Sequence, residues 1–207
     1  MTGRPVRVAV IDSGVAIPHP HIGAVAGGIS IDESGESADF SDRIGHGTAV
    51  MAAIMEKAPP VEGMVEYLAV RVFQASLRTR IEFLLRGIEW SLGQRVDLIN
   101  LSLGTAKPDY AERFTALIGR GARLIAPASS IPGSLPGVIR VFEAHDCPRD
   151  EYRRLSEFVF AASPFPRPVP GVPPERNLNG ISFAVANITG FLARDYETIF
   201  SSKPASR

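Results

Sequence analysis

The amino-acid sequence predicts an α/β fold of three layers, in which helices cover both faces of a mostly parallel central sheet. Short apolar, β-branched segments alternate along the chain with segments whose apolar residues recur at helical spacing. Parallel strands need crossover connections, and the helices of those crossovers cover both faces of the sheet. With 45% hydrophobic content in 207 residues, the chain can bury one large core. A single domain over residues 1–207 is therefore expected, with a disordered tail at residues 200–207.

The expected strands are short apolar runs that end at turn residues. The first run, residues 6–11, ends at Asp12, which Ser13 and Gly14 follow. A carboxylate at the carboxyl end of a buried strand is costly unless it is paired, and ligands bind at that edge of a parallel sheet. Asp12 is therefore a candidate site residue, although it can also simply order its own turn. The other expected strands are residues 24–31, 66–73, 96–103, 122–126, 138–142 and 158–161.

The expected helices have apolar or small residues on one face and start or stop signals at their ends. Residues 80–92 have apolar positions at helical spacing, and Asp109 is a plausible N-cap for a helix that ends at residue 118. A small-residue helix is expected at residues 49–55. The acidic, Ser-rich segment 32–42 between strand and helix is expected to be a solvated loop.

His46 lies between two glycines just before this small-residue helix. Such glycines leave the imidazole room and exposure, so a packed core histidine is not expected there. Histidine has an unperturbed pKa near neutrality and can act first as a general base and then as a general acid. His46 is therefore a candidate catalytic residue, although an isolated histidine is often incidental.

Ser182 lies where the Pro-rich loop at residues 163–174 and the residues after it give way to a last, almost wholly apolar helix. Gly180 lets the backbone approach a substrate closely. The first turn of a helix also offers unpaired N–H groups and a partial positive charge to an oxyanion. These properties suit a serine nucleophile, and the alternative is a serine that only caps a buried helix.

Composition excludes several other classes of function. The formal net charge is zero and the basic residues do not cluster, so neither a nucleic-acid nor a membrane partner is expected. Cys147 is the only cysteine, so no intrachain disulfide can form. The sequence has no visible signal segment and no apolar run of membrane-spanning length, and a cytoplasmic location is expected.

Three blocks in the order Asp, His, Ser resemble the subtilisin family of serine peptidases. Residues 8–14 (Val-Ala-Val-Ile-Asp-Ser-Gly), 45–48 (Gly-His-Gly-Thr) and 180–184 (Gly-Ile-Ser-Phe-Ala) are similar to the family's three blocks. Intervening segments such as residues 96–104 (Val-Asp-Leu-Ile-Asn-Leu-Ser-Leu-Gly) also have family counterparts, and the resemblance covers about residues 5–195. The order of the triad residues distinguishes subtilisin from other triad folds.

The resemblance implies a subtilisin-like fold and a role for each matching residue. Ser182 is expected to attack a peptide carbonyl, His46 to take and return its proton, and Asp12 to orient the imidazole. The resemblance also implies that a peptide substrate pairs as an added strand against the segment formed by Ser102, Leu103 and Gly104. This chemistry needs no metal or organic cofactor. The acidic segment 32–42 does not resemble the family's calcium loops, although its carboxylates could in principle ligate a hard cation, and the polar cluster 143–147 fits no zinc pattern.

The sequence departs from the family pattern beside the nucleophile. Family members usually have an asparagine after the strand at residues 122–126 as a side-chain donor to the oxyanion hole, whereas Ser129 or Ser130 falls at that position here. In subtilisin itself, loss of this donor costs about 10² to 10³ in rate. His is also replaced by Asn187 after the nucleophile. The early first strand predicts a minimal form without signal peptide or propeptide, which an activating or folding partner could assist.

Three functions remain open from the sequence. The first is a cytoplasmic serine endopeptidase with a narrow substrate, such as a precursor peptide. The second is a catalytically impaired pseudo-subtilase that binds peptides or a partner protein. The third is an unrelated α/β hydrolase or nucleotide-binding domain, which is weakly supported because no Gly-x-Ser-x-Gly or Gly-x-Gly-x-x-Gly motif is present at the required places.

Overall fold

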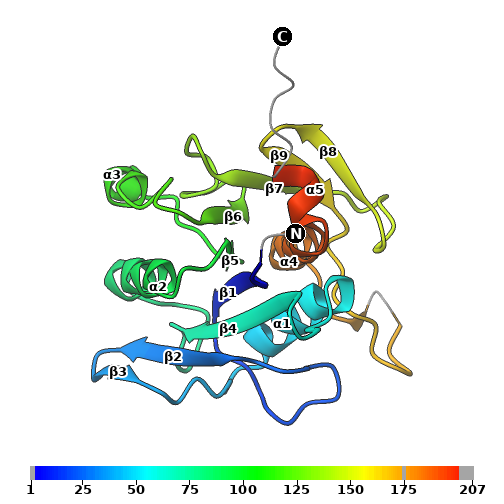
Figure 1. Ribbon diagram of the computed structural model, residues 1–207, viewed down its shortest axis with the longest axis horizontal. Coiled ribbons are helices and arrows are strands. Elements are labelled where there is room, and N and C mark those ends of the chain that lie inside the picture. The colour runs from blue at the N-terminus through cyan, green and yellow to red at the C-terminus, as the bar shows by residue number, and fades with distance from the viewer. Residues whose placement is uncertain (1–2, 174–175, 201–207) are drawn as a thin grey trace.

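The structure is a computed structural model that describes residues 3–173 and 176–200. The tail expected to be disordered lies outside the described residues from residue 201 onward. Within the described chain the strands form one nine-stranded sheet in the order β3-β2-β4-β1-β5-β6-β7-β9-β8 (Figure 1). The strands are β1 Val6–Asp12, β2 Gly27–Asp32, β3 Gly35–Ser37, β4 Val65–Arg71, β5 Leu98–Leu101, β6 Arg123–Pro127, β7 Ile139–Glu143, β8 Tyr152–Ser156 and β9 Val159–Ala162.

The predicted α/β class with a mostly parallel sheet is confirmed. The seven inner strands, β2-β4-β1-β5-β6-β7-β9 in sheet order, pair in parallel. The two outermost pairs, β2 with β3 and β9 with β8, are antiparallel. The parallel strands are apolar runs because both of their faces are buried. The helices are α1 His46–Lys57, α2 Ile81–Gly93, α3 Ala111–Thr115, α4 Ile181–Arg194 and α5 Tyr196–Phe200, with a 3-10 turn at Pro108–Tyr110.

Two hydrophobic cores lie on opposite faces of the sheet. In β1, Val8 and Val10 belong to the core beneath α1 and α4, whereas Ala9 and Ile11 belong to the core beneath α2 and α3. Figure 1 shows the same division, with α1 and α4 on one side of the sheet and α2 and α3 on the other. Side chains of β1 therefore alternate between two faces that are both covered by helices, so the domain has three layers: helices, sheet and helices.

Helices α1 and α4 also pack directly on each other. Gly190 permits this contact, because a Cβ added there would lie 2.7 Å from the backbone oxygen of Ile54. A larger residue would push the two helices apart. The residues at the start of α1 and of α4 are therefore fixed relative to one another by a helix–helix contact as well as by the sheet.

Three local expectations differ from the structure. The segment 32–42 is not only a solvated loop, since it contains β3 and folds back antiparallel on β2. Asp109 does not cap a helix, because Pro108 begins a 3-10 turn that includes it and α3 spans only five residues. Strand β8 was not expected, because this edge strand is mostly exposed and has no apolar run.

Candidate active site

Asp12 is the last residue of β1, and its side chain is almost fully buried at 1% exposure. Its Oδ1 accepts the backbone N–H of Ser13 at 2.7 Å and lies 2.7 Å from Nδ1 of His46. Within the described chain, its Oδ2 has no hydrogen-bond partner. The carboxylate is therefore desolvated and directed at one imidazole, which is the pairing that a buried charge requires.

His46 is the first residue of α1, and the two glycines beside it have different functions. Gly45 adopts a left-handed conformation with φ of 94°, which an L-residue rarely adopts. Gly47 allows α1 to approach the turn after β1, and its N–H donates to Ser13 Oγ at 2.8 Å. A Cβ on Gly47 would lie 2.3 Å from the backbone oxygen of Gly14. This close approach brings His46 into contact with Asp12.

Gly47→Ala is expected to destabilise the fold. The new methyl group meets backbone atoms of Ser13 and Gly14 rather than a movable side chain, so α1 must shift. We expect a loss of about 1–3 kcal/mol in the free energy of unfolding. Gly93→Ala is the matched control, because no atom lies within 4 Å of the added Cβ at this position of α2. Urea denaturation of both variants measures the difference, and equal midpoints would contradict the steric argument.

Asp42, expected from the sequence to lie in a solvated loop, supports the His46 turn. Its carboxylate accepts the backbone N–H groups of Ile44, Gly45 and Thr48 at 2.8–2.9 Å, and the hydroxyls of Thr48 and Ser13 at 2.6 and 2.9 Å. Burial alone would raise the pKa of Asp42, but these hydrogen bonds lower it overall. The sequence signal for this role of Asp42 was an acidic residue placed shortly before the start of a helix.

The pKa of His46 is raised above the ordinary value of 6.5. Burial acts to lower it, but the hydrogen bond and negative charge of Asp12, together with the charge of Asp42, outweigh burial. Asp12 and Asp42 therefore both stabilise the imidazolium form. This is the electrostatic arrangement that a general base needs when it accepts a proton.

Ser182 is the second residue of α4 and is held against the end of β5. Its hydroxyl donates to the backbone oxygen of Ser102 at 3.0 Å, and the Ser102 hydroxyl donates to the backbone oxygen of Ser182 at 2.9 Å. The Ser182 hydroxyl is therefore bonded to Ser102 and not to His46 in this structure. His46 packs against the residue that follows Ser182, with the ring centroids of His46 and Phe183 5.9 Å apart.

A buried polar network behind Ser182 was not predicted from the sequence. Asn100 donates from Nδ2 to Ser102 Oγ at 3.0 Å, and its Oδ1 accepts the Thr189 hydroxyl at 2.9 Å. Asn187 donates from Nδ2 to the backbone oxygens of Ser163 and Phe165 at 2.9 and 3.1 Å. The network ties α4 to β5 and to the Pro-rich loop. Its signal was the occurrence of three polar residues within apolar segments.

The expected substrate-binding segment borders a cavity of about 700 Å³. Leu103 and Gly104 line this cavity together with Ile81 and Leu84 of α2. Ser102 itself lies at the Ser182 end of the segment. The structure thus brings the expected peptide-binding segment and the expected nucleophile together at the carboxyl end of β5, where ligands of parallel sheets bind.

The two expected oxyanion candidates lie in different environments. Ser129 is exposed in the turn after β6. Ser130 is half-buried and packs against Gly104, because a Cβ on Gly104 would lie 2.0 Å from Ser130 Oγ. The Ser130 hydroxyl lies 3.5 Å from the backbone oxygen of Pro127. Ser130 is therefore the candidate that borders the substrate-binding segment.

Further features bear on cofactors and membranes. In the described part of the chain, no three His, Cys, Asp or Glu side chains are grouped so that they could hold a metal ion. Burial raises the pKa of the Cys147 thiol. Among the described helices, none is long and apolar enough to cross a membrane.

Comparison with known proteins gives consistent results. Residues 3–153 match the subtilase family. The chain is 36% identical to subtilisin E of Bacillus subtilis over 108 residues, which are 50% of this chain and 28% of that protein. It is 27% identical to the major intracellular serine protease of Bacillus subtilis over 94% of this chain and 70% of that protein. The chain spans a minor part of the length of several such relatives, for example 16% of the minor extracellular protease Epr.

Solved structures show the same similarity. The prenylagaramide maturation protease PagA superimposes with a TM-score of 0.67 at 27% identity, over 98% of this chain and 79% of that chain. A cold-adapted subtilisin-like serine proteinase superimposes with a TM-score of 0.66 at 19% identity, over 95% of this chain and 76% of that chain, and this likeness concerns the fold.

Proposed function

This chain belongs to the subtilase family, and on that premise we propose that it is a serine endopeptidase whose triad is Asp12, His46 and Ser182. The contact of 2.7 Å between the buried Asp12 carboxylate and His46 Nδ1 is the observation that carries the proposal. A desolvated carboxylate fixes the tautomer of the imidazole, so that Nε2 is free to accept a proton. Ser182 lies at the start of α4, which packs against the helix that begins at His46, and this supports the assignment.

The proposed reaction proceeds through an acyl-enzyme. Ser182 Oγ attacks the carbonyl carbon of the scissile peptide bond while His46 Nε2 takes the hydroxyl proton. The tetrahedral intermediate collapses, the C–N bond breaks, and His46 returns the proton to the leaving amine. Water then attacks the ester by the same route and releases Ser182. Asp12 stays ionised throughout and stabilises the imidazolium.

Binding of the peptide also acts on the nucleophile. The Ser182 hydroxyl donates to the backbone oxygen of Ser102, which is the acceptor that a peptide N–H pairs with when a substrate adds as a strand. A substrate that takes this acceptor leaves the Ser182 hydroxyl to donate to His46. Substrate binding thereby completes the hydrogen-bonded triad.

The oxyanion is stabilised by the Ser182 backbone N–H and by the Ser130 hydroxyl. A serine reaches less far than the asparagine that is usual in the family, so catalysis is slowed. Ser130→Asn is expected to raise kcat, by up to about 10² to 10³-fold, which is the contribution of that donor in subtilisin itself. Assay with a fluorogenic peptide measures the change, and Ser129→Asn is the matched control. A larger gain at Ser129 would reassign the donor position.

The pH dependence of activity provides another prediction. His46 must be neutral to accept the proton, and its pKa is raised above 6.5 by Asp12 and Asp42 despite burial. Activity is therefore lost as the pH falls through a value above 6.5, so the acid limb of the kcat/KM profile is expected above 6.5. In Asp12→Asn the limb is expected to move to lower pH. A wild-type limb at or below 6.5 would contradict this assignment.

We propose an intracellular precursor peptide as the substrate and one catalytic domain over the whole chain. Relatives include proteins named as an intracellular serine protease and as a maturation protease. A narrow substrate suits the weakened oxyanion hole, because a specific substrate can supply binding energy away from the reacting bond. An activating or folding partner is a part of the same proposal.

Labelling with a fluorophosphonate probe tests the proposal. Wild type is expected to be labelled at Ser182, and Ser182→Ala and His46→Ala are expected to remain unlabelled. The alternative function is a catalytically impaired subtilase that binds peptides, which the hydrogen bond from Ser182 to Ser102 favours. In that case folded wild type is not labelled, and peptide affinity is the same in Ser182→Ala.

A further inference from the structure

A second cavity, of about 580 Å³, lies beside His46. We call it the His19–Arg167 pocket; its walls are Ala16, His19, Pro20, His21, Asp42, Gly45, Thr48, Ala49, Ala52, Pro166, Arg167, Val169 and Pro170. Gly45 directly precedes His46, and Ala49 lies about 5 Å further along the axis of α1. The pocket therefore begins within one helical turn of the proposed catalytic base.

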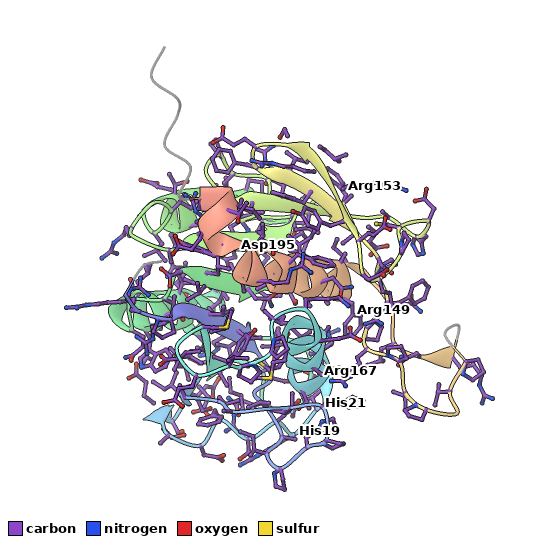
Figure 2. All side chains as sticks on the ribbon, turned by 45° about the vertical axis from the view of Figure 1, so that its right-hand side comes forward. His19, His21, Arg149, Arg153, Arg167 and Asp195 are labelled. Atoms are coloured by element: carbon purple, nitrogen blue, oxygen red, sulfur yellow. The ribbon has the colours of Figure 1, made fainter. Side chains whose placement is uncertain are left out.

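Three nitrogen-bearing side chains of this pocket have unused hydrogen-bond donors. The half-buried Arg167 guanidinium has no hydrogen bond or ion pair within the described chain, where only its backbone oxygen is engaged, by Asn177. Nδ1 of His19 accepts the backbone N–H of His21 at 3.2 Å, so Nε2 of His19 carries the proton. The two histidine rings meet edge-on, with centroids 5.5 Å apart. Figure 2 shows His19, His21 and Arg167 on the same side of the molecule.

The acidic groups nearby are already occupied. Asp42 lines the pocket, but its carboxylate accepts the five hydrogen bonds that order the His46 turn. Glu56 pairs with Lys57 and Arg149. Burial and the charges of Arg167 and His19 lower the pKa of His21, against a smaller opposite effect of Glu56. The pocket thus has spare donors, and the carboxylates of Asp42 and Glu56 are already engaged, a combination that suits an added carboxylate.

The pocket and the cavity beside the substrate-binding segment lie on opposite faces of the sheet. Leu103 and Gly104 line the cavity on the α2 face of the sheet, whereas the His19–Arg167 pocket lies against α1 on the other face. Figure 1 shows α1 and α2 on these opposite faces. Ser182 is bonded to Ser102 at one end of the substrate-binding segment, so we expect a peptide that pairs with residues 102–104 to reach the pocket with the part of its chain beyond Ser182.

We propose that the His19–Arg167 pocket binds an acidic side chain of the peptide substrate, on the side of the scissile bond opposite to the part that pairs with residues 102–104. This inference rests on the proposed peptidase function. Arg167 forms the ion pair, and the imidazoles of His19 and His21 donate the additional hydrogen bonds. The buried apolar walls from Ala52 and Pro166 strengthen the ion pair by excluding water on that side.

A positional library of fluorogenic peptides tests the proposal, with Glu or its uncharged counterpart Gln at each position in turn. Wild type is expected to prefer Glu at one position, on the side of the cleaved bond opposite to the part that pairs with residues 102–104. Arg167→Gln is expected to lower kcat/KM about tenfold more for that peptide than for its Gln counterpart. Arg167→Lys should keep part of the preference. Arg153→Gln is the matched control, since Arg153 lies on the same side of the molecule, pairs with Asp146 and does not line the pocket.

A binding measurement separates this inference from the peptidase function. The Glu peptides of the library are combined into one pool (the Glu pool) and the Gln peptides into another (the Gln pool). NMR titration of full-length Ser182→Ala is expected to show a higher His21 pKa with the Glu pool than with the Gln pool. If wild type cleaves no peptide, the peptidase proposal fails and this titration still decides the pocket. The inference is overturned by an unchanged His21 pKa, by a Glu preference that persists in Arg167→Gln, or by a preference on the other side of the bond. It is also overturned if free glutarate at equal concentration has the same effect as the Glu pool.

Discussion

Ser182→Ala is expected to reduce kcat for peptide hydrolysis by about 10⁶-fold, which is the size of the effect of losing the nucleophile in subtilisin itself. The substitution removes the only atom that can form the acyl-enzyme. It also removes the hydrogen bond of 3.0 Å to the Ser102 backbone oxygen, which an incoming peptide must otherwise displace. KM is therefore expected to stay the same or to fall slightly. Active-site titration combined with steady-state assays measures both quantities.

The control for this prediction is Ser129→Ala, which removes an exposed hydroxyl from the turn after β6. It is expected to keep full activity. Thermal unfolding of Ser182→Ala should match wild type, because a small side chain at the start of α4 is shortened by a single oxygen. Residual activity within a hundredfold of wild type in Ser182→Ala would show that another residue is the nucleophile.

Asp12→Asn is expected to reduce kcat by about 10⁴-fold. The amide keeps the shape of the side chain but lacks the negative charge that stabilises the His46 imidazolium. It can also donate a hydrogen bond to Nδ1 and so hold the imidazole in the wrong tautomer. The same oxygen, Asp12 Oδ1, accepts from Ser13 and from His46, so an amide that turns its NH2 group toward His46 also loses the hydrogen bond from Ser13.

The matched control is Asp97→Asn. It changes a largely buried carboxylate just before β5, at the amino ends of the parallel strands, whereas Asp12 lies at a carboxyl end. Asp97 pairs with Arg4 and accepts the backbone N–H of Arg7, so the substitution affects stability and not the triad. A loss of activity in Asp97→Asn as large as in Asp12→Asn would mean that the effect is one of folding. Circular dichroism of both variants completes the comparison.

The sequence was sufficient for the fold class because β1, β4 and β5 are apolar runs with both faces buried, and helices lie between them. The pairing of Asp12 with His46 was predicted only from the resemblance of residues 8–14 and 45–48 to two subtilisin blocks, since each residue alone had an ordinary explanation. The two side chains are in contact in the structure. Boundaries were less well predicted. Helix α1 begins at His46 rather than at residue 49, because Asp42 satisfies N–H groups of the first turn from outside the helix.

The polar network behind Ser182 was beyond the reach of the sequence. Thr189 and Asn100 are separated by 89 residues, and their hydrogen bond depends on how α4 lies across β5. Each lies alone in an apolar segment, which indicates a buried polar side chain but does not identify its partner. Likewise His19 and Arg167 come together only because the Pro-rich loop lies beside α1.

The contact between α1 and α4 at Gly190 bears on which parts of this protein can vary in evolution. The proposed base and the proposed nucleophile lie on two helices that approach each other closely at Gly190 and Ile54, and this contact helps to fix their relative positions. The loops before α2 and before α4 form walls of the two cavities. Insertions and substitutions there can alter which peptide is accepted while leaving the machinery in place. The proposed catalytic residues on the packed helices and the loops that form the cavity walls can therefore evolve separately.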